Sequence, residues 1–149
     1  MSKPVDPPFE FTRHVRDTCL CLHVQRAARA LARHFDEVLR PLELTNGQFS
    51  LLMSLNRPEP PNMGSVSALL EMDRTTLTAM LKPLERRGLV KVAVDPADKR
   101  GRRLTLTPAG RALLAKAAPV WRHAHAAVER RLRSGAEELR ADLRALSHD

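Results

Sequence analysis

The chain contains few of the residues on which many protein classes depend. It has no tyrosine, only 3% aromatic residues and only two cysteines among its 149 residues. No apolar run approaches the roughly 18 residues that a membrane-spanning helix needs. The N-terminal sequence also lacks the apolar core of a secretory signal. We therefore expect a cytoplasmic protein with reduced thiols and no membrane partner.

Signatures of catalysis and of metal binding are missing as well. No Ser-His-Asp or Cys-His ordering, glycine-rich phosphate loop or pair of carboxylates suggests an active site, so the sequence predicts neither an enzyme nor a bound cofactor. Cys19 and His23 would share one face of a helix, with His14 and His34 nearby. Two loose ligands without a carboxylate or a further cysteine do not make a metal site.

Positive charge is what the chain has in excess. Its formal net charge is +8 and its sequence pI is about 10.7, which favours a polyanionic partner. The hydrophobic fraction of 43% predicts a folded chain, and the length fits one domain.

The N-terminal half reads as a lead-in followed by helices. Residues 1–11 hold three prolines and no periodicity, which predicts a flexible arm. Apolar residues recur at helical spacing over 12–39, and Pro41 ends that long first helix. Thr45 and Gln48 form a capping box for the next helix, and Ser65 is expected to cap a short supporting helix.

A short polar turn then precedes the segment that is most informative about the fold. Asp73 caps a helix over 73–87 whose buried stripe is Leu77, Met80, Leu81 and Leu84. Gly88 is expected to stop this helix in the left-handed conformation. A strand over 89–94, a polar tip over 95–102 and a strand over 103–106 then form a hairpin wing.

Two helices complete the expected architecture. Thr107 and Pro108 start a helix that runs to about residue 133, and a last amphipathic helix covers 136–146. The fold class is therefore mainly α with a small β-hairpin wing (α+β), a winged helix-turn-helix with long terminal dimerisation helices. We assign 12–149 to one domain, with dimerisation helices at 12–40 and 108–149 and a DNA-binding lobe at 45–107.

Three segments together resemble a known family. LTNGQFSLL, DRTTLTAMLKPLERRGLV and DPADKRGRRLTLTPAG, in that order, are similar to the MarR family of bacterial transcriptional regulators. The resemblance implies a homodimer, most often a repressor, that binds a pseudo-palindromic operator and is released by a small molecule or an oxidant. The apolar surface of the terminal helices supports a homodimer independently.

The helix over 73–87 is expected to enter the major groove of double-stranded DNA. Arg74 would reach a guanine edge, Thr75 and Thr78 a phosphate or a thymine methyl, and Thr76 is the threonine expected to be structural. The alternative is that the threonines bond the local backbone and the cations are merely solvated. The predicted DNA-contacting residues are Ser65, Arg74, Thr75, Thr76, Thr78, Lys82, Arg86, Lys99, Arg100, Arg102 and Arg103.

The wing is expected to read the minor groove. The resemblance implies that Arg100 is the inserted residue, and a narrow minor groove attracts a guanidinium. Asp98 is expected to orient a neighbouring arginine. A charged hairpin tip that is only a soluble turn is the alternative.

Two routes for the regulatory signal remain open. Family members that sense organic hydroperoxides carry a reactive cysteine near the position of Cys21, but they also use tyrosines, and Gln25 stands where one would be expected. The alternative is that Cys21 is a small buried hydrophobe. The second route is a pocket for a small aromatic or anionic effector, with His23, Arg26, Phe49, Met53 and Trp121 as candidates, of which the last three could instead be plain core.

A different class of function also fits the pattern. An architectural winged-helix protein would use the same fold for protein contacts or non-specific DNA binding. Preference for one DNA sequence over random DNA separates the two classes.

Overall fold

The computed structural model describes residues 1–147, which form two compact units. The N-terminal unit comprises residues 1–34, and the main unit begins at Phe35. Helix α1 spans Phe9–Thr18, and helix α2 spans Leu20–Leu39 and so crosses from one unit into the other. No described helix is long and apolar enough to cross a membrane.

The first long helix of the sequence prediction is two helices. The backbone of Cys19 leaves the helical region, with ψ at 112°, although its N–H still donates to the carbonyl of Val15. The Cys19 sulfur accepts from the N–H of Leu22 at 3.4 Å and so caps α2. The hydroxyl of Thr18 donates to the carbonyl of His14, a local bond that competes with helix continuation. The prediction missed this break because no proline or glycine marks it.

The predicted arm is also shorter than expected. Helix α1 begins at Phe9, so residues 9–11 are helical and not part of a flexible lead-in. Pro8 precedes the first helical turn, and its carbonyl accepts from the N–H of Phe11. Proline before a helix ends the extended segment without blocking the turn that follows.

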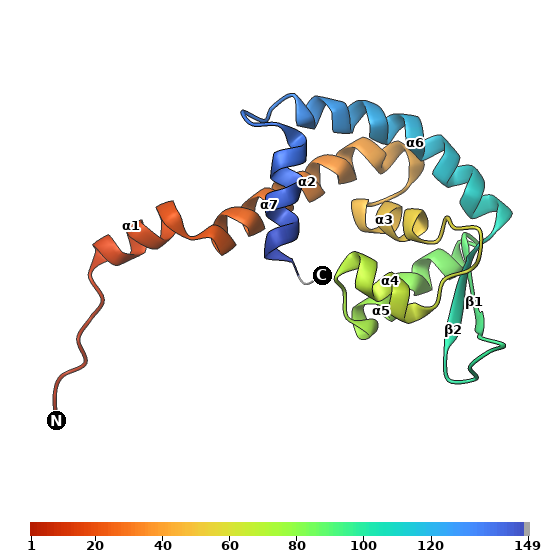
Figure 1. Cartoon of the computed structure of the whole chain (residues 1–149), viewed down its shortest axis with the longest axis horizontal. Helices are drawn as coiled ribbons and strands as arrows, with labels where there is room; N and C mark the ends of the chain where they lie inside the picture. The colour runs from red at the N-terminus through yellow and green to blue at the C-terminus, as the bar shows by residue number, and fades with distance from the viewer. Residues whose placement is uncertain (148–149) are drawn as a thin grey trace. The chain divides into compact units, whose positions relative to one another are not determined.

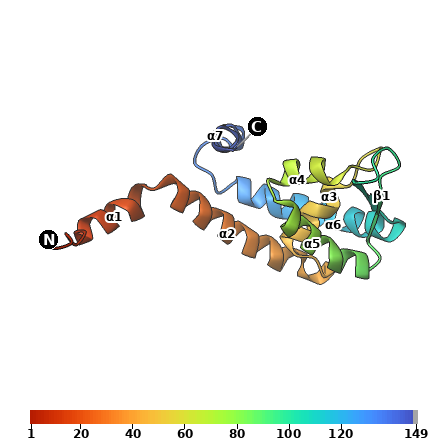
Figure 2. The ribbon, with the colours of Figure 1, turned by 90° about the horizontal axis from the view of Figure 1, so that it is seen from below.

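The main unit has the elements of a winged helix-turn-helix (Figure 1). The helices α3, α4 and α5 lie together beside α6, and the hairpin of β1 and β2 follows α5, as Figure 2 also shows. The bounds are η1 Arg40–Leu42, α3 Asn46–Ser54, α4 Met63–Leu70, α5 Arg74–Arg86, β1 Val90–Val94, β2 Arg102–Leu106, α6 Pro108–Glu129 and α7 Ala136–Leu146. Helix α6 thus ends before residue 133, where the sequence placed its end.

A leucine-rich core holds these elements together. The stripe of α5 is buried as predicted through Leu77, Leu81 and Leu84, while Met80 packs half-buried against the core. Burial of each leucine side chain favours the folded state by about 1.5–3 kcal/mol relative to its exposure to water. Other buried members are Leu39, Leu51, Leu52, Leu55, Val66, Leu89, Val90, Leu104 and Leu106.

Helix caps confirm most of the predicted boundaries. Thr45 and Gln48 form the full capping box, Asp73 accepts from the N–H of Thr76, and Thr107 accepts from the N–H of Gly110. Gly88 has φ of 70°, the left-handed value expected for a helix stop.

The cap predicted at Ser65 is wrong. Helix α4 begins at Met63, and the side chain of Asn62 accepts from the N–H of Ser65 at 2.9 Å. The hydroxyl of Ser65 donates back to the carbonyl of Asn62. Asn62 is an equally good cap but follows two prolines, so the sequence assigned it to the preceding loop.

The wing is a two-stranded antiparallel hairpin. Its register pairs Val90 with Leu106 and Val94 with Arg102. The segment before α4 adds to the free edge of β2, because the N–H of Leu104 donates to the carbonyl of Pro61 at 2.9 Å. This contact connects the hairpin to the loop between α3 and α4.

Candidate nucleic-acid interface

Helix α5 presents a polar, basic face opposite its buried stripe. The side chains of Arg74, Thr75, Thr78 and Lys82 are exposed and line a shallow hollow of about 380 Å³ together with Ala79. The 3.6-residue period puts these positions on the side of the helix away from the core. The helix therefore offers its N-terminal part and one flank to a partner.

The cations on this face are available for binding. Within residues 1–147, the side chains of Arg74, Lys82 and Arg86 form no hydrogen bond or ion pair. The Arg74 guanidinium lies close to the start of α4, where a Cβ added to Gly64 would be 3.5 Å from its Nη2. A guanidinium without a protein partner retains the donors that recognise a guanine edge or a phosphate.

The threonines divide into local and free groups. Thr76 donates both its N–H and its hydroxyl to the Asp73 carboxylate, at 2.7 and 3.0 Å, which confirms its structural role. Both bonds lower the pKa of Asp73, and the bond from the backbone N–H of Thr76 has the larger effect. The Thr78 hydroxyl donates to the carbonyl of Arg74, whereas the hydroxyl of Thr75 has no partner in the described chain.

The wing tip is shaped by two carboxylates. Asp98 accepts from the backbone N–H of Arg100 at 3.0 Å, so it contacts the neighbouring arginine through the backbone and not through the guanidinium. Asp95, which directly follows β1, pairs with an arginine side chain instead, because its carboxylate accepts from the Nε of Arg103 at 3.1 Å. The turn position of Asp98 explains the difference, since a short carboxylate in a turn bonds the backbone two residues on.

The wing cations therefore differ in their freedom. Arg103 is held by Asp95, and Arg102 donates to the carbonyl of Gly101. Lys99 and Arg100 are exposed and have no side-chain partner among the described residues. Ser65 lines another shallow hollow with residues of the 57–62 loop, but its hydroxyl is already bonded to Asn62.

The five effector candidates line two different hollows. Phe49, Met53 and Trp121 line a half-open cleft of about 580 Å³ in the main unit. Phe49 and Trp121 stack with ring centroids 6.2 Å apart, Phe49 also packs half-buried against the core, and Met53 is 44% exposed. The remaining lining residues are Phe35, Leu39, Asn46, Ser50, Asn56, Leu114, Ala118 and Arg122.

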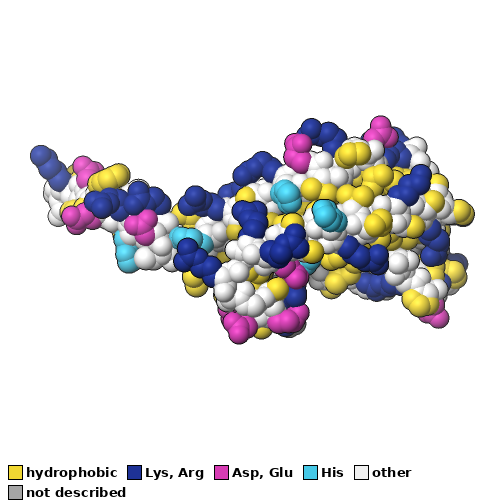
Figure 3. Space-filling model, turned by 90° about the horizontal axis from the view of Figure 1, so that it is seen from above, with side chains coloured by type: hydrophobic (Ala, Val, Ile, Leu, Met, Phe, Trp, Pro, Cys, Tyr) yellow, Lys and Arg dark blue, Asp and Glu magenta, His cyan; other side chains and the backbone are white. Residues whose placement is uncertain are grey.

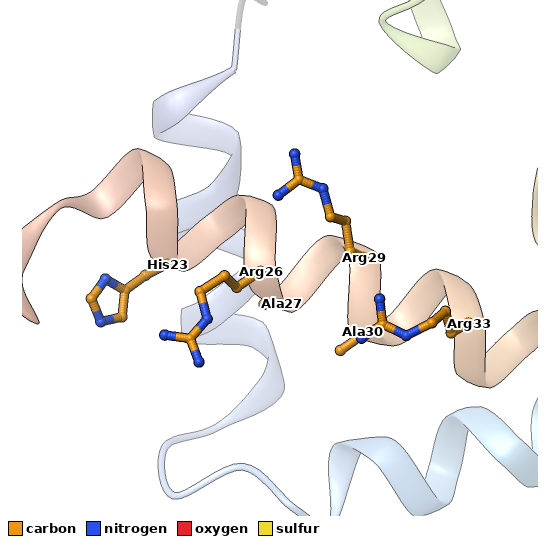
Figure 4. Close-up of a pocket in the computed structure, with 6 residues that line it drawn as sticks. All are labelled: His23, Arg26, Ala27, Arg29, Ala30 and Arg33. Carbon is orange, nitrogen blue, oxygen red and sulfur yellow. The ribbon is translucent and has the colours of Figure 1, made fainter. Parts of the chain in front are cut away.

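His23 and Arg26 belong to a different surface. They line a shallow hollow on α2, within the N-terminal unit, together with Ala27, Arg29, Ala30 and Arg33. Figure 4 shows the side chain of Arg29 extending away from those of His23 and Arg26. The basic residue that lines the aromatic cleft is Arg122, which the sequence analysis missed although it directly follows Trp121.

Cys21 is exposed in the N-terminal unit, so the single chain does not bury it as a small hydrophobe. The amide of Gln25 donates to its sulfur at 3.2 Å. Cys19 is half-buried, and both thiols are free.

Comparison with known proteins decides the family. The MarR family model matches residues 44–101. The structure of the transcriptional regulator MosR from M. tuberculosis in complex with DNA is 39% identical, covers 87% of this chain and 93% of that chain, and superposes with a TM-score of 0.79. The chain belongs to the MarR family. Its winged-helix fold is thereby confirmed.

Curated relatives of this MarR-family chain are also regulators. The transcriptional regulator TtmR of Methylorubrum extorquens is 37% identical over 100 residues, which are 67% of this chain and 51% of TtmR. The organic hydroperoxide resistance transcriptional regulator of Bacillus subtilis is 29% identical over 68% of this chain and 69% of its own length. This chain therefore spans about half the length of TtmR.

Positive charge in this MarR-family chain is not confined to α5 and the wing. Figure 3 shows Lys and Arg side chains spread over a second face, with acidic and apolar side chains among them. The hollow on α2 is itself basic, since Arg26, Arg29 and Arg33 line it. Net charge alone therefore does not single out one face of the chain as the candidate interface.

Proposed function

We propose that this chain is a sequence-specific transcriptional regulator that binds double-stranded DNA as a homodimer and acts as a repressor. The observation that carries the proposal is the exposed face of α5, on which the side chains of Arg74 and Lys82 have no protein partner in the described chain. The helix is rigidly seated by Leu77, Leu81 and Leu84, so this face is presented in a fixed orientation. A fixed basic helix face is suited to the major groove.

The second DNA contact in this proposal is the wing. Its base is held by the Asp95–Arg103 ion pair, while Lys99 and Arg100 project from the tip. An unpaired guanidinium at a hairpin tip suits a narrow minor groove, where the negative potential is strongest. Two such modules in a two-fold dimer would contact half-sites about 34–36 Å apart.

The terminal helices support the homodimer. Helices α1 and α7 bury no residue, and α2 buries only Leu39. Several of their large apolar side chains are exposed, with Leu20 at 69% and Leu146 at 61%. Apolar surface of this kind is covered in a stable protein, and a second copy supplies the matching helices.

A small-molecule effector is the proposed release signal. The cleft beside Trp121 combines an aromatic wall with Arg122 and the polar side chains of Asn46, Ser50 and Asn56. Such a concave, mainly apolar lining with a few polar groups is typical of a ligand site. A small aromatic or anionic molecule fits this chemistry.

An oxidant is the second candidate signal. The exposed Cys21 thiol favours it, since accessibility is a condition for oxidation. The similarity to the organic hydroperoxide resistance regulator of Bacillus subtilis also supports it. The absence of tyrosine from the chain is the feature that opposes it.

A DNA-binding titration tests the main proposal. Fluorescence anisotropy would compare labelled upstream intergenic DNA with a scrambled control at physiological salt. We expect a preference of about 10³ or more for the upstream DNA. Equal affinity for both DNAs would contradict the proposal and favour an architectural winged-helix protein. Sedimentation of the free protein would show a dimer, and a monomer at all concentrations would reject that part.

The same titration separates the two signals. Cumene hydroperoxide would be added to wild type, to Cys21→Ser and to Cys19→Ser as the matched control. The oxidant route would be established by three results together. The peroxide abolishes DNA binding by the wild type, a thiol reductant restores that binding, and Cys21→Ser, but not Cys19→Ser, still binds DNA in the presence of the peroxide. Binding that survives the peroxide leaves the small-molecule route.

A further inference from the structure

One face of α6 carries a continuous column of interacting side chains. Trp121, His125 and Glu129 are spaced four residues apart and therefore lie above one another along the helix. The rings of Trp121 and His125 stack with centroids 4.5 Å apart and planes 16° from parallel. The Nδ1 of His125 lies 3.4 Å from Oε1 of Glu129.

The two ends of this column meet different parts of the main unit. At one end, Phe49 of α3 stacks on Trp121, and both rings line the aromatic cleft. At the other end, Arg140 of α7 donates from Nη1 to the same Oε1 of Glu129, at 2.9 Å. Arg140 also donates from Nε and Nη2 to Oε1 of Glu137, one turn earlier in α7.

The Glu129–Arg140 pair is the main attachment of α7 to α6. Within residues 1–147, no other hydrogen bond or ion pair joins these two helices. Helix α7 buries none of its residues, so apolar packing holds it weakly. Arg140 also lowers the pKa of Glu129, which keeps the carboxylate charged for His125 and Arg140 together.

The orientation of Trp121 in the wall of the cleft therefore depends on the position of α7. The orientation of Trp121 is restricted by the stacked His125, and His125 is restricted by Glu129. Because Glu129 shares one oxygen between His125 and Arg140, a shift of α7 changes the position available to the imidazole. A molecule that moves Trp121 acts on the same chain of contacts in reverse.

We propose that His125, Glu129 and Arg140 are positioning residues that couple the Trp121 wall of the cleft to α7. This inference rests on the proposed function, in which the cleft takes the effector and α7 belongs to the dimer. A molecule bound in the cleft changes the position of α7 and thereby the affinity of the dimer. Dimer formation through α7 changes the affinity of the cleft for that molecule by the same factor.

Tryptophan fluorescence tests the coupling, because Trp121 is the only tryptophan of the chain. Arg140→Met removes the attachment and leaves Trp121 unchanged. Arg144→Met removes an exposed arginine of the same helix whose side chain has no partner in the described chain. We expect acrylamide to quench Trp121 about twofold more strongly in Arg140→Met than in wild type, with Arg144→Met unchanged. Equal quenching in the two variants would overturn the proposal.

Two further variants exclude a trivial loss of folding. Glu129→Gln keeps the shape of the side chain and removes its charge, and it should reproduce the effect of Arg140→Met at an unchanged helical circular dichroism signal. His125→Gln interrupts the column, so adding Arg140→Met to it should produce no further change in quenching. An additive double variant would show that the effect does not pass through His125.

A ligand probe tests whether the cleft itself responds. The aromatic anion 8-anilinonaphthalene-1-sulfonate should bind the wild type, and its Kd should change at least about threefold in Arg140→Met but not in Arg144→Met. No binding, or the same Kd in all proteins, would overturn the coupling between cleft and helix. These measurements use no DNA, so a chain that passes them but binds no operator would count against the proposed function alone.

Discussion

Asp95 accepts a hydrogen bond from the Nε of Arg103 at 3.1 Å across the base of the wing. The same Oδ1 accepts from the backbone N–H of Ala97, and the Asp95 side chain is only 14% exposed. One carboxylate oxygen thus holds both the start of the wing tip and the opposite strand.

Removal of this carboxylate should weaken DNA binding more than folding. We expect Asp95→Ala to lower operator affinity by about threefold to tenfold, because the tip that carries Arg100 loses its order before binding, at about 0.5–1.5 kcal/mol for each side chain that must then be immobilised. The melting temperature should change little, since a partly exposed ion pair contributes about 0–1 kcal/mol. Anisotropy titration and thermal unfolding would measure the two effects. A large loss of stability with unchanged affinity would contradict this role.

Arg74 should determine base preference. Arg74→Ala is expected to cost about 1–3 kcal/mol of operator binding and to relax the preference at one base position of each half-site. Titration against operators with single base changes would show it. Lys116→Ala, which removes an exposed cation of α6, is the matched control. Unchanged operator affinity in Arg74→Ala would reject the docking of α5.

Lys82 should act on all DNA sequences alike. Its side chain lies two turns further along α5, where contact with the backbone of DNA is expected. Lys82→Ala should weaken operator and scrambled DNA by the same factor and reduce the slope of log K against log salt by about 1. A loss confined to the operator would instead assign Lys82 to base recognition.

Gly110 should be the glycine least tolerant of substitution. A Cβ at this position would lie 2.1 Å from the backbone carbonyl oxygen of Leu89, at the junction of α6 and the hairpin. We expect Gly110→Ala to lower the free energy of unfolding by about 2 kcal/mol or more, because backbone has to move. Gly135→Ala, where nothing lies within 4 Å, should stay within about 0.5 kcal/mol in the same urea titration.

Acid should weaken the junction of α2 and α3. Asp36 accepts from the N–H and the side-chain amide of Asn46, at 2.7 and 2.9 Å, and these bonds lower its pKa. A lowered folded-state pKa gives stability that is present above the unfolded value and is lost as pH falls through the folded value. Between about pH 5 and pH 3 the melting temperature should therefore fall less in Asp36→Asn than in wild type. Parallel curves would contradict a contribution from Asp36.

Much of the fold was predictable because its signals are local. The caps at Thr45, Asp73 and Thr107 depend on residues three positions apart, and the left-handed stop at Gly88 depends on one residue. The stripe of Leu77, Leu81 and Leu84 follows from helical periodicity alone. Where two good caps compete, as Asn62 and Ser65 do, the sequence pattern chose the wrong one.

The sequence by itself determined the order of elements, the basic helix and the basic wing, because periodicity, capping and charge are written in neighbouring residues. Only the tertiary structure decided which side chains meet. It paired Asp95 with Arg103, gave the aromatic cleft a lining that does not include His23 or Arg26, and joined Trp121 through His125 to Glu129 and Arg140. These contacts join residues of different elements, or depend on rotamers that packing selects, and no local pattern encodes them.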